Sequence, residues 1–375
     1  MKTICNSSFC TGCGACVNVC PRNAIIKKNS LFFNEMSIDE DKCVNCKRCF
    51  NVCPNNILAD KRRPISVKQG WAANDHVRSL ASSGGVETQI ALYFQDNYGI
   101  VFCCSHKNQN YDFIKCESTD DILSASGSKY VKSSISAHIK DIIDILRSGK
   151  NVLLIALPCQ IAAVLNAAKI LNVDVDNLYT IDLICHGAPK QDLLCRFLKE
   201  NNFIKTEFDN ISFRKKAYFS LSVNGKFIKP KGVKDRYTAA FLSGLIYEEN
   251  CYSCRYASFD RISDITLGDS WGSDLEQSEL DKGISLILLQ SKKGEELLRC
   301  AGVITKDVDI NKAVKFNKQL SSPSNMPAER KDFIRNINKG EKFNTAMFKA
   351  YPIPTIKAKI KEIILIHKYQ KEQKK

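Results

Sequence analysis

The chain has no apolar run long enough to cross a membrane; its longest uninterrupted hydrophobic stretches are of the size of VLLIAL at 152–157. A membrane-spanning helix needs about twenty such residues, so we expect no transmembrane segment. No secretory signal is recognisable ahead of Cys5. The formal charge of +15 is spread along the chain and comes without a nucleic-acid-binding motif. This pattern favours an acidic protein partner or a phosphorylated ligand and argues against nucleic acid.

Cysteine, in contrast, is abundant, with eighteen residues in a chain of 375. A disulfide-stabilised secreted protein is the usual explanation for many cysteines in a short chain. This chain is too long for that class, and half of its cysteines stand in metal-ligand spacings. We therefore expect a reducing, cytoplasmic location.

The cysteine pattern is clearest between Cys10 and Pro54, where C-x2-C-x2-C-x3-C-P occurs twice, from Cys10 and from Cys43. In bacterial ferredoxins three cysteines of such a run bind one 4Fe-4S cluster and the fourth binds the other. Applied here, the pattern predicts one cluster on Cys10, Cys13, Cys16 and Cys53, and a second cluster on Cys43, Cys46, Cys49 and Cys20.

Zinc is the alternative occupant, because soft thiolates in a tetrahedral arrangement suit both zinc and iron–sulfur clusters. Zinc sites usually combine two C-x2-C pairs. They do not usually show two cysteine triplets, each followed by a trailing Cys-Pro. The spacing therefore favours iron–sulfur clusters.

The two runs differ in charge: Lys47 and Arg48 occupy the places of Gly14 and Ala15. Cations close to a cluster favour its reduced state. We expect the second cluster to have the higher reduction potential, unless both side chains point into water, where their effect is lost.

The length predicts two or three domains. The two-cluster region occupies 1–58, and the basic segment 59–69, which contains Lys-Arg-Arg-Pro, is expected to be a solvated linker. Residues 70–350 form the main body, and 351–375 form a basic tail that we expect to be helical.

Two stretches of the main body share one layout, an apolar strand that ends at a cysteine. KNVLLIALPCQIAAVLNAAKI places Cys159 directly after a buried strand, and LYTIDLICHGAPK does the same for Cys185. Carboxyl ends of parallel strands meet at one edge of a sheet, so both thiols are predicted to lie at that edge. Cys251 and Cys254 add a C-x2-C pair. These four cysteines are enough for a third cluster, although a lone C-x2-C is more often zinc or inert.

Two Gly/Ser-rich segments could bind phosphate through backbone amides. Ser82-Ser83-Gly84-Gly85 precedes a helical run, whose N-terminus favours anions. SASGSKYVKSS at 124–134 is a polar loop with two lysines. A simple helix cap and an ordinary surface turn are the alternative interpretations.

The tail from Thr355 combines lysines with isoleucines at helical spacing. A docking terminal helix with one solvated face explains this pattern, as does peripheral contact with an acidic membrane surface.

Beyond residue 66, six motifs occur in an order that resembles the coenzyme F420 hydrogenase/dehydrogenase beta-subunit family, in its bacterial branch with a fused two-cluster ferredoxin domain. They are RSLASSGG (78–85), GSKYVKS (127–133), LPCQIAAV (157–164), DLICHGAP (182–189), ISFRKK (211–216) and CYSCRYASFDRISDITLGDSWG (251–272).

The resemblance implies a mixed α/β fold: a ferredoxin-like α+β two-cluster domain, followed by an α/β domain that binds FAD and a third 4Fe-4S cluster. It makes Cys159, Cys185, Cys251 and Cys254 the candidate ligands of that cluster. His186 is a candidate for contacting cofactor or substrate, and equally for supporting the strand end. The residues expected to line the flavin are Ser82, Ser83, Gly84, Gly85, Gly127, Ser128, Lys129, Tyr130 and Lys132.

Iron–sulfur clusters pass one electron at a time, and a flavin can exchange either one or two. We therefore expect an oxidoreductase that relays electrons from an acidic ferredoxin- or flavodoxin-type partner through the clusters to FAD and a small organic substrate, which is F420 or another metabolite. The alternative is an electron-transfer subunit without its own substrate site that serves a partner enzyme. No side chain is singled out as a catalyst.

Overall fold

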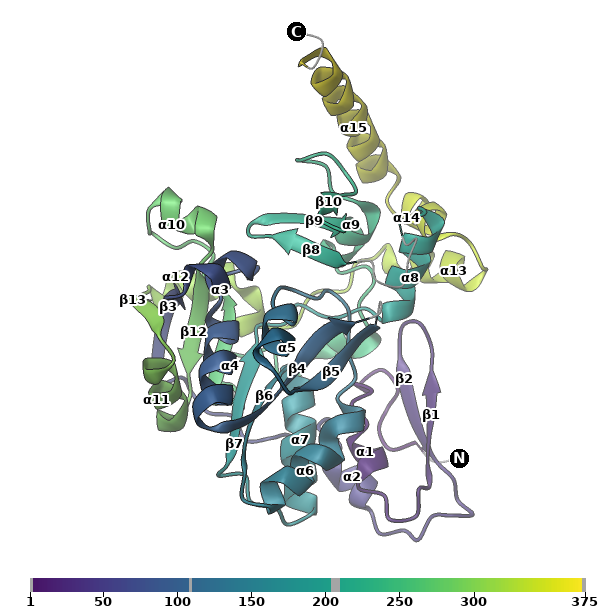
Figure 1. Ribbon diagram of the computed structural model, residues 1–375. Helices are drawn as coiled ribbons and strands as arrows, with labels where there is room; N and C mark the ends of the chain where they lie inside the picture. Colours follow the sequence, from purple (N-terminus) through teal and green to yellow (C-terminus); the bar gives the residue numbers. More distant parts are fainter. Residues whose placement is uncertain (1–2, 108–109, 204–209, 373–375) are drawn as a thin grey trace.

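The computed structural model describes residues 3–107, 110–203 and 210–372. Its centre is a mixed sheet of eight strands, in the spatial order β13-β3-β12-β11-β7-β6-β4-β5 (Figure 1). Listed in that order, the strands are Val303–Asp307, Ser66–Ala72, Ser285–Leu289, Ile265–Asp269, Leu178–Leu183, Asn151–Ala156, Gly99–Lys107 and Asn110–Cys116.

The middle of this sheet is parallel: β11 pairs with β7, β7 with β6, and β6 with β4. The remaining strand pairs are antiparallel. Strands buried on both faces read as continuous apolar runs, which accounts for the sequence of β6. Its Val152 and Leu154 face one core, and Leu153 and Ile155 face the other.

Helices cover both faces of the sheet. The core on one face joins the sheet to α4 (Val86–Asn97), α5 (Thr119–Ser124) and α11 (Lys292–Cys300). The opposite face carries α6 (Ile139–Arg147), the 3-10 turn η1 (Ser136–His138) and α7 (Pro158–Ile170). Further elements flank the β13–β3–β12 edge: α3 (Asp75–Leu80), α10 (Gln277–Lys282), α12 (Ile310–Phe316) and η3 (Lys318–Leu320).

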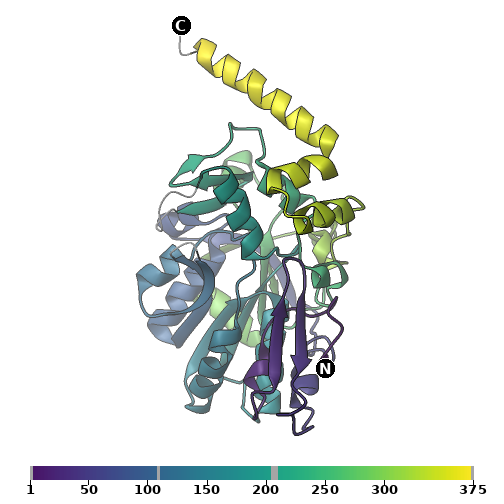
Figure 2. The ribbon, with the colours of Figure 1, turned by 90° about the vertical axis from the view of Figure 1, so that its right-hand side faces the viewer.

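The N-terminal cysteine-rich region packs on α7 and shares a core with it (Figure 2, where this region lies at the front). It consists of an antiparallel hairpin and two short helices, β1 (Ile25–Asn29), β2 (Asn34–Ile38), α1 (Ala15–Asn18) and α2 (Arg48–Val52). Ala15 and Val52 are fully buried at this contact. The predicted order, a ferredoxin-like α+β region followed by an α/β body, is confirmed.

Within 70–350 the structure contains a further core besides the two that cover the faces of the large sheet. It joins the three-stranded sheet β8 (Ile211–Lys215), β9 (Tyr218–Val223) and β10 (Lys226–Phe227) to four helices, α8 (Gln191–Glu200), α9 (Arg236–Leu242), α13 (Arg330–Asn338) and α14 (Phe343–Ala350). Its centre is aromatic: Phe343 lies 5.4 Å, between ring centroids, from both Phe197 and Phe333.

The tail is helical, as expected. Helix α15 (Pro352–Glu372) projects from the body beyond α14, and Ile353, Ile356, Ile360 and Ile363 on it are exposed (Figures 1 and 2). One anchor is the Lys229 Nζ, which lies 2.7 Å from Glu362 Oε1. Among the described residues no helix has the length and hydropathy of a membrane span.

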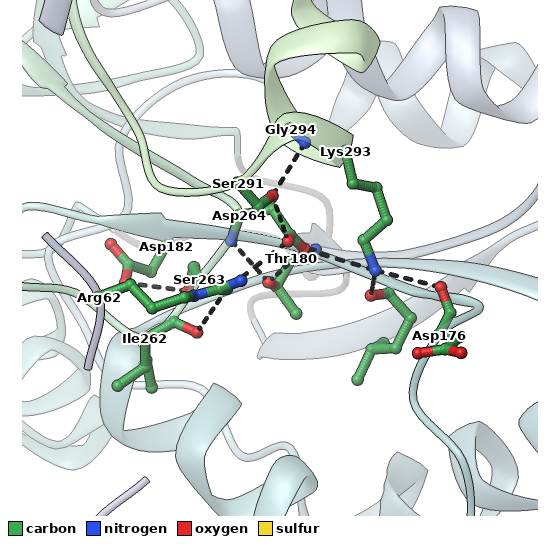
Figure 3. A network of polar contacts seen from close by, with 11 residues as sticks. Arg62, Asp176, Thr180, Asp182, Ile262, Ser263, Asp264, Ser291, Lys293 and Gly294 are labelled. Carbon is green, nitrogen blue, oxygen red and sulfur yellow. Dashed lines mark hydrogen bonds and ion pairs between the residues drawn. The ribbon is translucent and has the colours of Figure 1, made fainter. Parts of the chain in front are cut away.

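The expectation of a solvated linker at 59–69 is wrong in its second half, because β3 begins at Ser66 and pairs with both β12 and β13. The first half of the segment is also fixed to the main body, through Arg62. The backbone N–H of Arg62 donates to the Arg261 carbonyl at 2.6 Å, and its guanidinium lies 3.6 Å from Asp264 (Figure 3). Asp264 is buried and accepts hydrogen bonds from Thr180 in β7 and from Ser291 before α11. A basic side chain here neutralises a buried carboxylate; the sequence alone shows only a charge run.

Candidate functional site

The first group of thiols lies where the N-terminal region meets α7. Cys10, Cys16 and Cys53 are buried, and Cys13 is partly buried. Burial raises the pKa of the Cys16 thiol, and the charges of the other three raise it further, which places all four side chains close together. Cys5, which the ferredoxin pattern leaves out, lies against Cys10 and Cys53.

The second group lies nearer the surface. Cys20, Cys43, Cys46 and Cys49 together line a small cavity of about 20 Å³. Cys46 is exposed, and the other three are partly buried. Backbone N–H groups of Ala24 and Asn45 donate to the sulfur atoms of Cys20 and Cys43, at 3.3 and 3.4 Å. Lys47 and Arg48 beside them are exposed, so water screens their charges.

The third group forms at the edge of the large sheet. Cys159 follows β6 as the second residue of α7, and Cys185 follows β7, so the prediction that both thiols share one sheet edge is confirmed. The turn η2 (Glu249–Ser253) supplies Cys251 and leads into Cys254. Burial raises the pKa of Cys159 strongly, and the thiols of Cys254, Cys185 and Cys251 raise it further. The four side chains therefore converge.

The first and third groups are neighbours. Between them lies Tyr256, whose hydroxyl donates to the Pro54 carbonyl at 2.8 Å. Burial raises the pKa of this hydroxyl, and the thiols of Cys159, Cys13 and Cys254 raise it further. Tyr256 is therefore close to both the first and the third group. The second group is the most exposed of the three, and the first and third groups are buried or partly buried.

Among the described residues, no three His, Cys, Asp or Glu side chains converge on a point where a single metal ion could sit. Cluster thiols each bind a different iron atom and so stand farther apart than the ligands of one ion. Backbone N–H groups directed at the sulfur atoms also fit a cluster, because such hydrogen bonds set its potential.

Next to the third group a cavity of about 490 Å³ opens at the carboxyl ends of the parallel strands. This volume falls in the range of small-molecule and cofactor sites. Cys185 and His186 form part of its wall, as do Ile155 to Leu157 at the end of β6. Open α/β sheets place their ligands at this edge.

Most of the predicted flavin residues lie in the wall of this cavity: Ser82, Ser83, Gly85, Gly127, Ser128, Lys129, Tyr130 and His186. The two loops that carry them are joined, because the Ser128 backbone N–H donates to Ser82 Oγ at 2.7 Å. Gly85 is the N-cap of α4, with φ of 79° and no side-chain cap, so free amides face the cavity at a helix N-terminus. The structure therefore joins two segments that are far apart in sequence.

Gly84 and Lys132 are the two predicted flavin residues that the cavity wall does not include. Gly84 is wedged between β3 and β12, and its N–H donates to Ser285 Oγ at 3.1 Å. Lys132 extends away from the cavity, and its ammonium donates to the Thr11 carbonyl and to Glu248. The expectation that it lines the flavin does not match this position.

The cavity also contains residues that were not among the predicted site residues, chiefly Arg214 and Asp269. Arg214 makes two hydrogen bonds to the Asp269 carboxylate, at 2.7 and 2.5 Å, and one to the Ser82 carbonyl at 2.7 Å. Its Nε atom is buried and has no partner among the described residues, which leaves one donor for a ligand. These residues lie in the ISFRKK and LGDSWG motifs, but only the fold shows that the two motifs meet.

Comparison with known proteins gives matches in two regions of the chain. A model described as "4Fe-4S dicluster domain" matches residues 9–57, and a second model of that description matches 35–111. The second match shares the second cysteine run and continues into β3, α4 and β4, which belong to the large sheet. The N-terminal region is therefore a 4Fe-4S dicluster domain, and the protein is an iron–sulfur protein.

The model for the C terminus of the beta subunit of coenzyme F420 hydrogenase/dehydrogenase matches residues 149–311, which include Cys159, Cys185, Cys251 and Cys254. A chain of the xenon-derivatised F420-reducing NiFe hydrogenase complex from Methanosarcina barkeri has a similar fold. The TM-score is 0.52 at 17% identity, over 75% of this chain and 97% of that one. Residues 149–311 therefore carry the C-terminal domain of that family, and a 4Fe-4S dicluster domain precedes it in the chain.

Proposed function

We propose that the chain is an iron–sulfur flavoprotein oxidoreductase. Its thiols hold three 4Fe-4S clusters in a row from the surface to a flavin pocket, and its substrate is F420 or another small two-electron metabolite. The observation that carries this proposal is the line of three cysteine groups, which ends in the wall of the cavity at Cys185. The outer end of the line is at the surface, where Cys46 is exposed, and Cys159 at the other end is buried.

The residues assigned to each cofactor follow from this line. Cys10, Cys13, Cys16 and Cys53 would hold the first cluster, and Cys20, Cys43, Cys46 and Cys49 the second. Cys159, Cys185, Cys251 and Cys254 would hold the third. FAD would occupy the cavity, where it supplies the exchange between one-electron and two-electron chemistry.

The chain's own groups suit a dinucleotide. The N-terminal amides of α4 favour phosphate, and Lys129 adds a positive charge to the same wall, in which Arg214 is paired with Asp269. Tyr130 stacks on Phe241 with ring centroids 4.3 Å apart and gives the cavity a flat, rigid side. Burial lowers the pKa of His186, so this imidazole is neutral at pH 7 and can accept or donate a hydrogen bond.

A direct test is the rate at which bound FAD bleaches when the anaerobic chain is mixed with a reduced ferredoxin. Cys159→Ser removes a proposed ligand of the third cluster. We expect this variant to keep the iron of the dicluster domain and its FAD, but to lose fast bleaching. Cys104→Ser is the matched control, because Cys104 lines the same cavity outside the cysteine groups. Equal bleaching in Cys159→Ser and the unaltered chain would overturn the proposed relay.

A second candidate function is an electron-transfer subunit that serves a separate enzyme, and it is supported by the fold shared with a chain of a hydrogenase complex. The two functions differ in how the reduced flavin is reoxidised. If F420 or a nicotinamide reoxidises it in the isolated chain, the chain is an enzyme. If only a protein acceptor does so, the chain is a subunit.

A further inference from the structure

Between the first and third cysteine groups the structure contains a buried ion pair of Lys132 and Glu248. Lys132 Nζ lies 2.5 Å from Glu248 Oε2, and the two side chains are 10% and 3% exposed. Lys132 also donates to the carbonyl of Thr11, a residue located between Cys10 and Cys13. Glu248 precedes Cys251 by three residues and leads into η2. The pair therefore connects the dicluster domain to the third group.

Its surroundings hold the pair in place. Asn34 of β2 is buried, and its Nδ2 donates to Glu248 Oε1 at 3.2 Å. Gly12 makes room for this contact, because a Cβ atom there would lie 2.7 Å from the Asn34 side chain. The Lys190 Nζ lies 4.0 Å from Glu248 on the other side and donates to the Phe33 carbonyl at 3.0 Å.

The cation of this pair faces both groups of thiols. Burial lowers the pKa of Lys132, but Glu248 and the thiols of Cys159 and Cys251 more than offset this effect, so the net shift is upward. On the other side, a hydrogen bond with Cys5 lowers the pKa of Cys10, and the charge of Lys132 lowers it further. The ammonium is thus a fixed positive charge within reach of the first and third groups.

We infer that Lys132 is a positioning and electrostatic residue that raises the reduction potentials of the clusters on both sides of it, with Glu248 as its counter-charge. This inference rests on the proposed function for the third cluster only, since the dicluster domain includes Cys10. A buried charge acts through a low dielectric, whereas water screens the exposed Lys47 and Arg48 beside the second group. The inner clusters therefore attract the electron more strongly than the outer one.

The sequence suggests that the second cluster, beside Lys47 and Arg48, has the higher reduction potential. The position of Lys132 reverses that order. Electrons from an external one-electron donor protein pass inward one at a time. With clusters bound, each inward transfer would oxidise the outer cluster by one electron and reduce the inner one by one, and no bond or proton would change place. The Lys132 charge favours the inward direction of each step.

The test is a redox titration of the full, cluster-loaded chain followed by electron paramagnetic resonance. Lys132→Met removes the cation, and we expect the midpoint potentials of the first and third clusters to fall. Lys132→Arg should restore them. Glu248→Gln removes the anion but keeps a polar side chain for Asn34, and we expect the same potentials to rise. Lys47→Met is the matched control beside the second group and should change little.

The opposite signs separate an electrostatic role from a structural one, because loosening the domain contact would move both variants in the same direction. Should Lys132→Met fail to fold, Glu248→Gln still decides the question. Unchanged potentials in a variant that retains its clusters overturn the inference. Retention of about eight irons by the unaltered chain instead points to failure of the third-cluster assignment; the inference is then judged on the first cluster alone.

Discussion

At the scale of single residues, buried charges are the features on which the structure depends most directly. Asp182 in β7 is fully buried, and it accepts hydrogen bonds from Arg261 at 3.2 and 2.7 Å and from Ser263 at 2.9 Å. Arg261 also donates to the Leu183 carbonyl, next to the strand end that leads to Cys185. The pair thus supports the edge that positions the third cysteine group.

We predict that Arg261→Met lowers the free energy of unfolding by about 3–5 kcal/mol, because it leaves the Asp182 carboxylate buried without its counter-charge. The matched control is Arg335→Met, whose ion pair with Asp332 is exposed on both sides. Exposed pairs contribute about 0–1 kcal/mol. Denaturant unfolding of both variants checks this. Similar losses for the two would contradict the role given to Arg261.

Lys216, close to the cavity, gives a pH-dependent prediction. Burial lowers its pKa to about 8, with the positive charges of Arg78, Arg214 and Lys215 as further causes. An unfolded lysine titrates near 10.4. Between these values the unfolded chain binds more protons, so the Lys216 contribution to stability rises with pH. Below pH 8 Lys216 is protonated in both the folded and the unfolded chain, and the full free-energy cost of burying its charge opposes folding.

The measurement compares the unaltered chain with Lys216→Met by denaturant unfolding at pH 7.5, 8.5 and 9.5. We expect the unaltered chain to gain stability relative to the variant as the pH increases across this series. A difference that stays constant with pH would show that Lys216 titrates as an ordinary surface lysine.

At the scale of elements, the loop 82–85 owes its position to glycine. A Cβ atom on Gly84 would lie 2.4 Å from the Gly70 carbonyl in β3 and 2.8 Å from the Ser285 nitrogen in β12. The backbone N–H of Ala72 donates to the Gly84 carbonyl at 2.9 Å. The loop therefore fits between two strands only without a side chain.

We predict that Gly84→Ala destabilises the chain by about 1–3 kcal/mol, the cost of overpacking, and lowers the FAD retained on purification. Gly149→Ala is the control, because no atom lies within 4 Å of its added Cβ and only the φ of 75° is strained. Unfolding and flavin absorbance are measured for both. Normal FAD retention by Gly84→Ala would show that the position of the 82–85 loop does not determine flavin binding.

How much the sequence could predict also differs between elements. Local patterns predicted the strands that end at Cys159 and Cys185, because period and spacing are properties of neighbouring residues. Strand β3 was hidden in a basic segment, since its partners β12 and β13 lie more than two hundred residues away. The Lys132–Glu248 pair spans 116 residues. Without the fold, Lys132 resembles any lysine in a phosphate-binding loop.

At the scale of the whole molecule, residues from distant segments of the chain come together at one edge of the large sheet. The dicluster domain packs on α7, the helix that starts at the third cysteine group, and the cavity opens beside that group. Placing carriers on rigid elements is what electron transfer over several centres needs, because their separations stay fixed. The exposed second group leaves one end of the line open to a partner protein.

The central claim is that three clusters and one flavin share this chain, and cofactor content tests it most directly. Iron, acid-labile sulfide, zinc and FAD are quantified in the full chain purified without oxygen. The account predicts about twelve irons, about twelve sulfides and about one FAD per chain. About eight irons without FAD, or zinc in place of iron, would contradict it.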